Sequence, residues 1–269
     1  MLPFIQAFGH SINMYWLSVI VGIVLAFALA LLRAKSDCFR TSCKHTFFTM
    51  LFAVLGARVG AALFKLVGHI FLYATMPDFW TAENIFGILR SGGVFYGGLV
   101  GGFLAVLFYI HENKLDFRDV TDLLMPAIPL FHMFGRLGCF FAGCCYGRAS
   151  TWGIAMPNGI MRIPVQLIEA GFCLVILAGM LLLRPERKRP GILLPTYLVF
   201  YSIGRFIIEF MRGDISRGVF LLSTSQWLSL LVLLMLVVIL VVKRKREAVR
   251  KALAQTTVAN SKTNDESFE

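Results

Sequence analysis

Residues 134–148 read Phe-Gly-Arg-Leu-Gly-Cys-Phe-Phe-Ala-Gly-Cys-Cys-Tyr-Gly-Arg. They end a long apolar segment and bring Arg136 together with three cysteines and four glycines. An arginine inside an apolar segment costs about 2.5–3.5 kcal/mol on membrane-insertion scales, so one that is retained there indicates a functional site. Glycines allow backbones and bulky ligands to approach closely. The stretch therefore predicts a site in a membrane-embedded chain.

The composition around this stretch is that of a membrane protein. Of 269 residues, 58% are hydrophobic and only 15% are charged, whereas soluble domains carry about 25% charged residues. The net charge of +11 comes from lysines and arginines that cluster in short loops between apolar segments. This clustering is typical of the cytoplasmic side of membrane proteins and argues against a nucleic-acid partner.

Apolar segments of about 20 residues predict membrane-spanning helices. The chain contains seven of them, and the first is not followed by a cleavage site of small residues, so we expect it to be retained. The predicted spans cover residues 12–32, 47–71, 94–109, 120–141, 165–183, 192–210 and 227–242. They form one predicted domain over residues 1–245, and residues 246–269 are predicted to be a polar, disordered cytoplasmic tail.

The loops predict the orientation of the chain. Basic residues follow the first, third, fifth and seventh spans, near residues 33–44, 114–118, 184–189 and 243–251. Cytoplasmic loops carry such an excess, so we expect the amino terminus outside and the carboxyl terminus in the cytoplasm. Residues 134–148 then lie at the outer end of the fourth span.

Two stripes of polar residues lie inside the predicted spans. His132, Arg136 and Cys139 are spaced i, i+4 and i+7, so a helix presents them on one face. Arg205 and Glu209 begin a second such stripe, which Arg212 completes, and Glu209 is expected to form an ion pair there. The spans contain more arginines than acids, and the planar guanidinium fork suits a lipid phosphate.

The third span is rich in glycine. Gly93, Gly97 and Gly101 belong to a small-xxx-small pattern, which most often indicates helix packing alone. Tyr96 lies among these glycines. Its hydroxyl is either a hydrogen-bonding group directed into a cavity or part of a packing seam.

The cysteines do not predict a metal site. A structural zinc ion needs four ligands that meet at one point. Cys38 and Cys43 are predicted at the cytoplasmic end, while Cys139, Cys144 and Cys145 are predicted outside, about 30 Å of hydrocarbon away. A disulfide from Cys139 to Cys144 or Cys145 stays open, although helix geometry does not favour it. We expect neither a metal nor a cofactor.

Taken together, motifs along nearly the whole chain resemble the prolipoprotein diacylglyceryl transferase family of bacterial membrane enzymes. The matching positions are Tyr15, the Gly-x-Arg-x-Gly around Arg58, the Gly-Gly-x-x-x-Gly-Gly of residues 92–98, Asp122, Pro126, Pro129, the Gly-Arg-Leu-Gly of residues 135–138, Phe140, Gly143, Gly147, the Pro-Val-Gln-Leu-Ile-Glu of residues 164–169, Tyr201, Arg205, Glu209 and Arg212.

The resemblance implies a fold and a reaction. The fold is an all-α polytopic membrane protein with seven transmembrane helices around a lipid-accessible central cavity, in the bacterial cytoplasmic (inner) membrane. The reaction moves a diacylglyceryl group from phosphatidylglycerol to the lipobox cysteine thiol of a prolipoprotein and releases glycerol phosphate. The partners are therefore phosphatidylglycerol, prolipoproteins and the lipid bilayer.

The chain departs from the family pattern at several polar positions. Tyr96 replaces a histidine, Cys139 and Ala142 replace asparagines, Cys144 replaces a glutamate, and Ile163 replaces another histidine. His132 stands where the family usually has an apolar residue. Histidine has an unperturbed pKa of about 6.5, so this residue is either the general base or a buried histidine hydrogen-bonded to backbone.

The resemblance and these departures predict the site residues. We expect catalytic roles for Arg136, Arg205, Tyr96 and His132. Substrate-binding roles are expected for Arg136, Arg58, Glu209, Cys139, Cys144, Gln166 and Tyr15.

Two other functions stay open at this point. An enzyme of the same fold could act on a different acceptor, with Cys139 or Cys144 carrying a transient thioether or thioester. A non-catalytic homologue could bind phosphatidylglycerol without consuming it. A transporter is less favoured because no repeated halves are visible.

Overall fold

The computed structural model describes residues 4–7, 10–35, 39–73, 81, 95–155, 159–183, 191–213, 218–219 and 222–265. The side chains of residues 7, 10, 72, 73, 95, 96, 218, 219 and 251–265 are outside this description. The contacts between residues divide the chain into two units. Unit 1 comprises residues 1–144 and 170–194, and unit 2 comprises residues 145–169 and 195–269.

The described part of the chain is mostly helical. Its helices are α1 (Met14–Ala34), α2 (Cys43–Tyr73), α4 (Phe95–Glu112), α5 (Phe117–Leu124), α6 (Ala127–Ala142), α7 (Val165–Leu183), α8 (Leu193–Glu209) and α9 (Thr224–Asp265). Each predicted span overlaps at least one described helix. Five helical segments are long and apolar enough to cross a membrane, and residues 97–112 form a shorter apolar helix.

The fourth predicted span is interrupted rather than continuous. Residues 120–141 were expected to form one helix, but α5 ends at Leu124 and α6 begins at Ala127. Pro126 separates the two helices, because proline has no N–H to donate and restricts the residue before it. Pro129 is tolerated because it lies in the first turn of α6, where its N–H is not needed.

Short strands, which were not predicted, accompany the helices. They pair as antiparallel hairpins: β1 (Phe4–Ala7) with β2 (His10–Asn13), β3 (Ala149–Ala155) with β4 (Met161–Arg162), and β5 (Gly218–Val219) with β6 (Leu222–Ser223). Asn13 is the last residue of β2 and the N-cap of α1, and its side chain accepts a hydrogen bond from the N–H of Tyr15 at 2.9 Å.

The last helix is longer than the seventh predicted span. α9 continues through residues 246–265, where a disordered tail was predicted. Its first half, residues 246–255, consists almost entirely of good helix formers (Arg, Glu, Ala, Lys, Leu and Gln). The division into a membrane domain and a polar tail stays a prediction.

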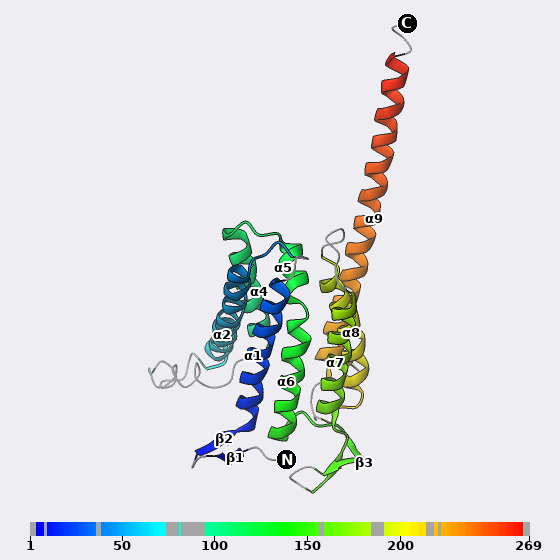
Figure 1. Ribbon diagram of the computed structural model, residues 1–269. Coiled ribbons are helices and arrows are strands. Elements are labelled where there is room, and N and C mark those ends of the chain that lie inside the picture. Colours follow the sequence, from blue (N-terminus) through cyan, green and yellow to red (C-terminus); the bar gives the residue numbers. More distant parts are fainter. Residues whose placement is uncertain are drawn as a thin grey trace. The chain divides into compact units, whose positions relative to one another are not determined.

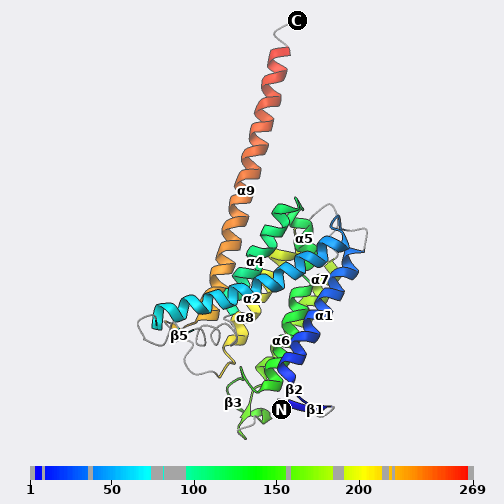
Figure 2. The same ribbon diagram turned by 90° about the vertical axis from the view of Figure 1, so that its left-hand side faces the viewer.

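In unit 1, α2 packs against α4 through glycines, and Figures 1 and 2 show the two helices side by side. A Cβ on Gly60 would lie against the carbonyl oxygen of Gly97 and 2.7 Å from the Cα of Gly101. Only glycine permits such a distance between backbones, so packing is the role of this glycine pattern.

α1 packs against α6 in the same unit. A Cβ on Gly22 would lie 2.7 Å from the Cβ of Phe134, and one on Gly138 would lie 3.1 Å from the ring of Tyr15. These close approaches hold α1 against the carboxyl-terminal half of α6, which carries the first part of the 134–148 stretch.

Within unit 1, two carboxylates of α5 accept hydrogen bonds from the segments that precede α2 and α8. Asp122 is 2% exposed and accepts the N–H groups of Gly191 and Leu193, the latter at 2.9 Å. Asp119 accepts the N–H and hydroxyl of Thr41 at 2.9 and 2.6 Å. Asp122 was predicted inside a continuous span, but its carboxylate in fact caps the chain that enters α8.

Candidate active site

A buried cluster of charges surrounds Arg205 in unit 2. Arg205 Nη2 lies 2.6 Å from a carboxylate oxygen of Glu209, and Nη1 lies 3.8 Å from one of Glu169. These side chains are 9%, 5% and 1% exposed respectively. The expected ion pair between Arg205 and Glu209 is present.

Three helices bring this cluster together. α8 supplies Arg205 and Glu209 one turn apart, the first turn of α7 supplies Glu169, and α9 supplies Ser225, whose hydroxyl accepts from Arg205 Nη2 at 3.1 Å. Tyr201, one turn before Arg205, donates its hydroxyl to Glu169 at 3.3 Å. The guanidinium therefore has a fixed orientation in a site with little access to water.

The predicted spans contain more arginines than acids, which predicted an unpaired arginine charge. Arg205 is not that arginine, because its charge is paired. Two carboxylates face it, because the turn that begins α7 adds Glu169 to the expected partner. Arg212 is also buried, at 8% exposure, but α8 ends at Glu209. Arg212 thus follows the helix and does not extend the predicted i, i+4, i+7 stripe.

The first predicted stripe lies on one helix of unit 1. His132, Arg136 and Cys139 are spaced one turn apart along α6, and all three are half-buried. Tyr15 lies against this helix at Gly138, between the positions of Arg136 and Cys139. The structure therefore brings four predicted site residues to the same end of the α1–α6 pair.

Two cysteines meet where α6 ends. Gly143 has a positive φ of 70° and closes the helix, which turns the chain back so that the Cys144 thiol donates to the Cys139 carbonyl at 3.7 Å. The two sulfur atoms lie within 4.8 Å of each other. Glycine is suited to this left-handed conformation.

The remaining predicted site residues are Gln166, Arg58 and Tyr96. Gln166 is 1% exposed in the first turn of α7. Arg58 is exposed on α2 and forms no hydrogen bond or ion pair with the residues that the structure describes. The side chain of Tyr96 and all of Cys38 are outside the described residues.

Comparison with known proteins identifies the family. The family model "Prolipoprotein diacylglyceryl transferase" matches residues 3–242. The chain belongs to the prolipoprotein diacylglyceryl transferase family. It is 30% identical over 236 residues to the phosphatidylglycerol--prolipoprotein diacylglyceryl transferase of Clostridium tetani, covering 85% of this chain and 92% of that protein.

Other curated relatives show comparable similarity. The protein of the same name from Photobacterium profundum is 33% identical over 238 residues, with 84% of each chain covered. A Bordetella bronchiseptica relative is 32% identical over 244 residues, covering 82% of this chain and 86% of its own. The resemblance read from the motifs is confirmed.

Sequence reasoning did not assign Glu169 or Tyr201 to the site of this transferase, although both were motif positions, and it did not name Ser225 at all. A signal was present: Ser223-Thr-Ser-Gln226 matches a helix capping box. Ser223 N–H donates to Gln226 Oε1 at 2.9 Å, and Gln226 N–H donates to Ser223 Oγ at 3.2 Å. Recognising the box would have started α9 at Thr224 and placed Ser225 in its first turn.

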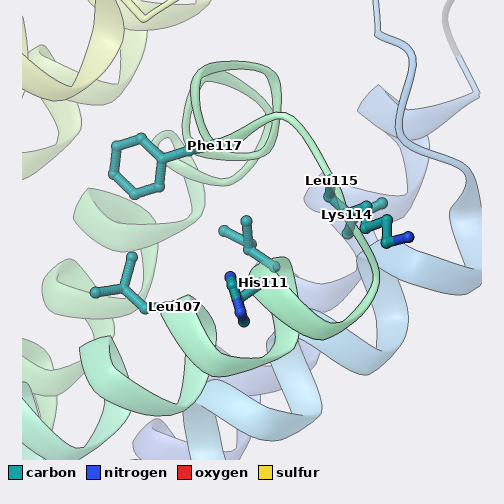
Figure 3. Close-up of a pocket in the computed structure, with 6 residues that line it drawn as sticks. Leu107, His111, Lys114, Leu115 and Phe117 are labelled. Atoms are coloured by element: carbon teal, nitrogen blue, oxygen red, sulfur yellow. The ribbon is translucent and has the colours of Figure 1, made fainter.

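A cavity of about 650 Å³ in unit 1 is separate from the predicted site residues of the transferase. Leu107 and His111 of α4 line it together with Phe117 at the start of α5 (Figure 3). Its remaining lining is formed by Ile110, Lys114 and Leu115. It is mostly apolar and belongs to the connection between the two helices.

Proposed function

We propose that this transferase moves the diacylglyceryl group of phosphatidylglycerol to the lipobox cysteine thiol of a prolipoprotein and releases glycerol phosphate. Membership of the family and the names of its curated relatives support this reaction. It is the first step of bacterial lipoprotein maturation, and the substrates are a lipid and a protein precursor whose lipobox cysteine still carries a free thiol.

The observation that carries the proposal is the fixed guanidinium of Arg205. Its side chain projects from the apolar helix α8, is 9% exposed, and is held by Glu209, Glu169 and Ser225. Burying charge is costly unless it is paired, and a charge oriented in advance stabilises a developing anion without reorganisation. The developing anion in this reaction is the phosphate of the leaving group.

The transfer requires one bond to form and one to break. The thiol loses its proton to a base, the thiolate attacks the glyceryl carbon, and a C–S bond forms as the C–O bond to phosphate breaks. The electron pair of that bond leaves with glycerol phosphate. We assign neutralisation of the phosphate to Arg136 and Arg205, and orientation of Arg205 to Glu209.

The base is assigned to His132, with Tyr96 as a hydrogen-bond donor to the phosphate. His132 lies one turn before Arg136 on α6, so a thiol at the phosphate end of the lipid would be within reach of both. Arg58, Gln166, Tyr15, Cys139 and Cys144 are assigned to substrate binding. The position of Tyr15 against Gly138 supports its inclusion.

We further propose seven transmembrane spans around a lipid-accessible central cavity, in the bacterial cytoplasmic membrane. Five helices already satisfy the length and hydropathy of a span. α4 and α8 would be the other two. The alternation of basic loops supports an amino terminus outside and a carboxyl terminus in the cytoplasm.

A second candidate function uses the cysteine pair. The thiols of Cys139 and Cys144 lie within 4.8 Å of each other, which favours a variant reaction in which one of them carries the lipid group before another acceptor receives it. Intact-protein mass spectrometry after incubation with phosphatidylglycerol would show a diacylglyceryl increment on one cysteine. An unchanged mass during turnover contradicts this candidate.

The proposed function is tested with Arg136→Ala in purified protein, supplied with phosphatidylglycerol and a synthetic lipobox peptide. We expect transfer to fall at least about a hundredfold, since removing one oriented charge or donor typically has that effect. Arg244→Ala, at an exposed position of α9, is the matched control. Full activity of Arg136→Ala, with both variants inserted in the membrane, would overturn the assignment.

A further inference from the structure

The positive charge of Arg205 is balanced by its neighbours within unit 2. Nη2 lies 2.6 Å from a carboxylate oxygen of Glu209, and Nη1 lies 3.8 Å from one of Glu169. One guanidinium therefore faces two carboxylates. An anion that binds beside Arg205 needs hydrogen-bond donors from other groups as well.

The first turn of α9 is held directly beside Arg205. Ser225, the second residue of α9, accepts a hydrogen bond at Oγ from Arg205 Nη2 at 3.1 Å. The capping box of Ser223 and Gln226 fixes where the helix begins. Gln226 Nε2 also donates to the Phe206 carbonyl at 3.5 Å, which ties this turn to α8 one residue after Arg205.

The hydroxyl of Ser225 keeps a proton to donate. A serine hydroxyl offers one donor and two acceptor lone pairs, whereas a guanidinium only donates, so the contact with Arg205 occupies a lone pair. Within the ranges that the structure describes, the O–H of Ser225 has no acceptor. The side chain is half-buried, so it is fixed by Arg205 and still open to a ligand.

The start of α9 itself favours an anion at this point. The first N–H groups of a helix have no acceptor within the helix, and the aligned peptide dipoles place about half a positive charge at its amino-terminal end. The first turn of α9 carries no acidic residue that would pair with this partial charge. Arg205 Nη1, which is buried, also has no hydrogen-bond acceptor among the described residues. Two kinds of donor therefore meet where Arg205 contacts Ser225.

We propose that Ser225 is a further substrate-binding residue of the transferase, whose hydroxyl donates a hydrogen bond to a non-bridging phosphate oxygen of phosphatidylglycerol. The hydrogen bond strengthens as the C–O bond breaks, because negative charge grows on the phosphate oxygens. Ser225 thus adds an uncharged donor to the compensated charge of Arg205. The identity of the lipid rests on the proposed function.

The competing role for Ser225 is that of a positioning residue, which orients Arg205 and never touches the lipid. Loss of the hydroxyl slows transfer in both cases, so activity alone does not separate the two roles. A phosphorothioate lipid separates them, because sulfur in place of one non-bridging oxygen is a weak acceptor. The sulfur weakens a contact to that oxygen and leaves the contact between Ser225 and Arg205 intact.

The test is transfer to a lipobox peptide by the full-length protein in phosphatidylcholine nanodiscs that contain phosphatidylglycerol. We expect Ser225→Ala to lower the transfer rate at least about tenfold, since hydrogen bonds to charged groups are among the strongest. Ser225→Thr keeps the hydroxyl and should remain close to the unchanged protein. Ser229→Ala is the matched control one turn further along α9, because the Ser229 hydroxyl donates to the Ser225 carbonyl at 2.9 Å instead.

The two phosphorothioate diastereomers of the lipid then decide between contact and positioning. The unchanged protein should transfer one diastereomer more slowly than the other, and the difference should shrink in Ser225→Ala because the contact is already lost. A difference of the same size in both proteins overturns the contact, and so does an unchanged transfer rate in Ser225→Ala. Ser225→Cys carries the same test if Ser225→Ala fails to fold, since a thiol is a weak donor.

Lipid binding without the peptide separates this inference from the proposed function. Native mass spectrometry of the nanodisc protein gives the amount of phosphatidylglycerol bound by each variant. Binding that Ser225→Ala weakens, in a protein that transfers nothing, would overturn the proposed function and leave the contact standing. Transfer and binding that Ser225→Ala leaves unchanged would overturn the contact and leave the proposed function standing.

Discussion

The guanidinium of Arg205 lies between two carboxylates, at 2.6 Å from Glu209 and 3.8 Å from Glu169. Removing one partner of a buried pair leaves an uncompensated charge, which is far more costly than removing an exposed pair. The hydroxyl of Tyr201 fixes the second carboxylate. The orientation of one arginine thus depends on side chains from different helices.

At the residue scale, Glu209→Ala is expected to destabilise the protein by about 3–5 kcal/mol and to lower transfer more than it lowers lipid binding. The physical reason is that Arg205 keeps its charge but loses its nearest carboxylate. Thermal unfolding in detergent and initial transfer rates measure the two effects. Glu247→Ala on exposed α9 is the control, and equal behaviour of the two variants would count against this account of Arg205.

The residues of the site were predictable from the sequence to different degrees. An i, i+4 spacing placed Arg205 beside Glu209 because a helix repeats every 3.6 residues. Glu169 is distant in the sequence, so no spacing could bring it to Arg205.

At the scale of elements, close glycine contacts hold α2 against α4. Gly60→Ala is expected to cost about 1–3 kcal/mol, because a Cβ there collides with backbone of Gly97 and Gly101. Gly68→Ala is the matched control on the same helix, since nothing lies within 4 Å of its position. Unfolding midpoints of both variants in detergent give the comparison, and equal midpoints would contradict this packing.

A second prediction concerns the link between α5 and α8. Asp122→Ala leaves the N–H groups of Gly191 and Leu193 without their acceptor, which should cost about 1–3 kcal/mol. Hydrogen exchange at the start of α8 should become faster. Glu112→Ala, at an exposed position of α4, should leave the exchange rate at the start of α8 unchanged. If Asp122→Ala also leaves that rate unchanged, Asp122 does not hold the start of α8.

Hydropathy located the helices well because each span is a long apolar run. It missed the break at Pro126, since residues 117–142 taken together are apolar enough to read as one segment. The short strands were also missed, because hairpins of two to seven residues give no periodicity strong enough to detect. Pro126 itself is visible in the sequence, and a proline inside a helical pattern indicates such a break.

At the scale of the whole molecule, the family explains which features this chain shares and which are its own. The family model covers residues 3–242, so the apolar helices and both polar clusters fall within the shared region. The cysteines at positions 139 and 144 are departures that motif comparison could identify but not interpret. Their proximity at the end of α6 is a structural result.

The central claim is that this chain joins a diacylglyceryl group to a cysteine thiol. The most direct measurement is the intact mass of a lipobox peptide after incubation with the purified protein and phosphatidylglycerol, with released glycerol phosphate counted in the same sample. The account predicts a diacylglyceryl increment on the peptide and an equal amount of glycerol phosphate. A protein that binds the lipid but yields neither product would contradict it.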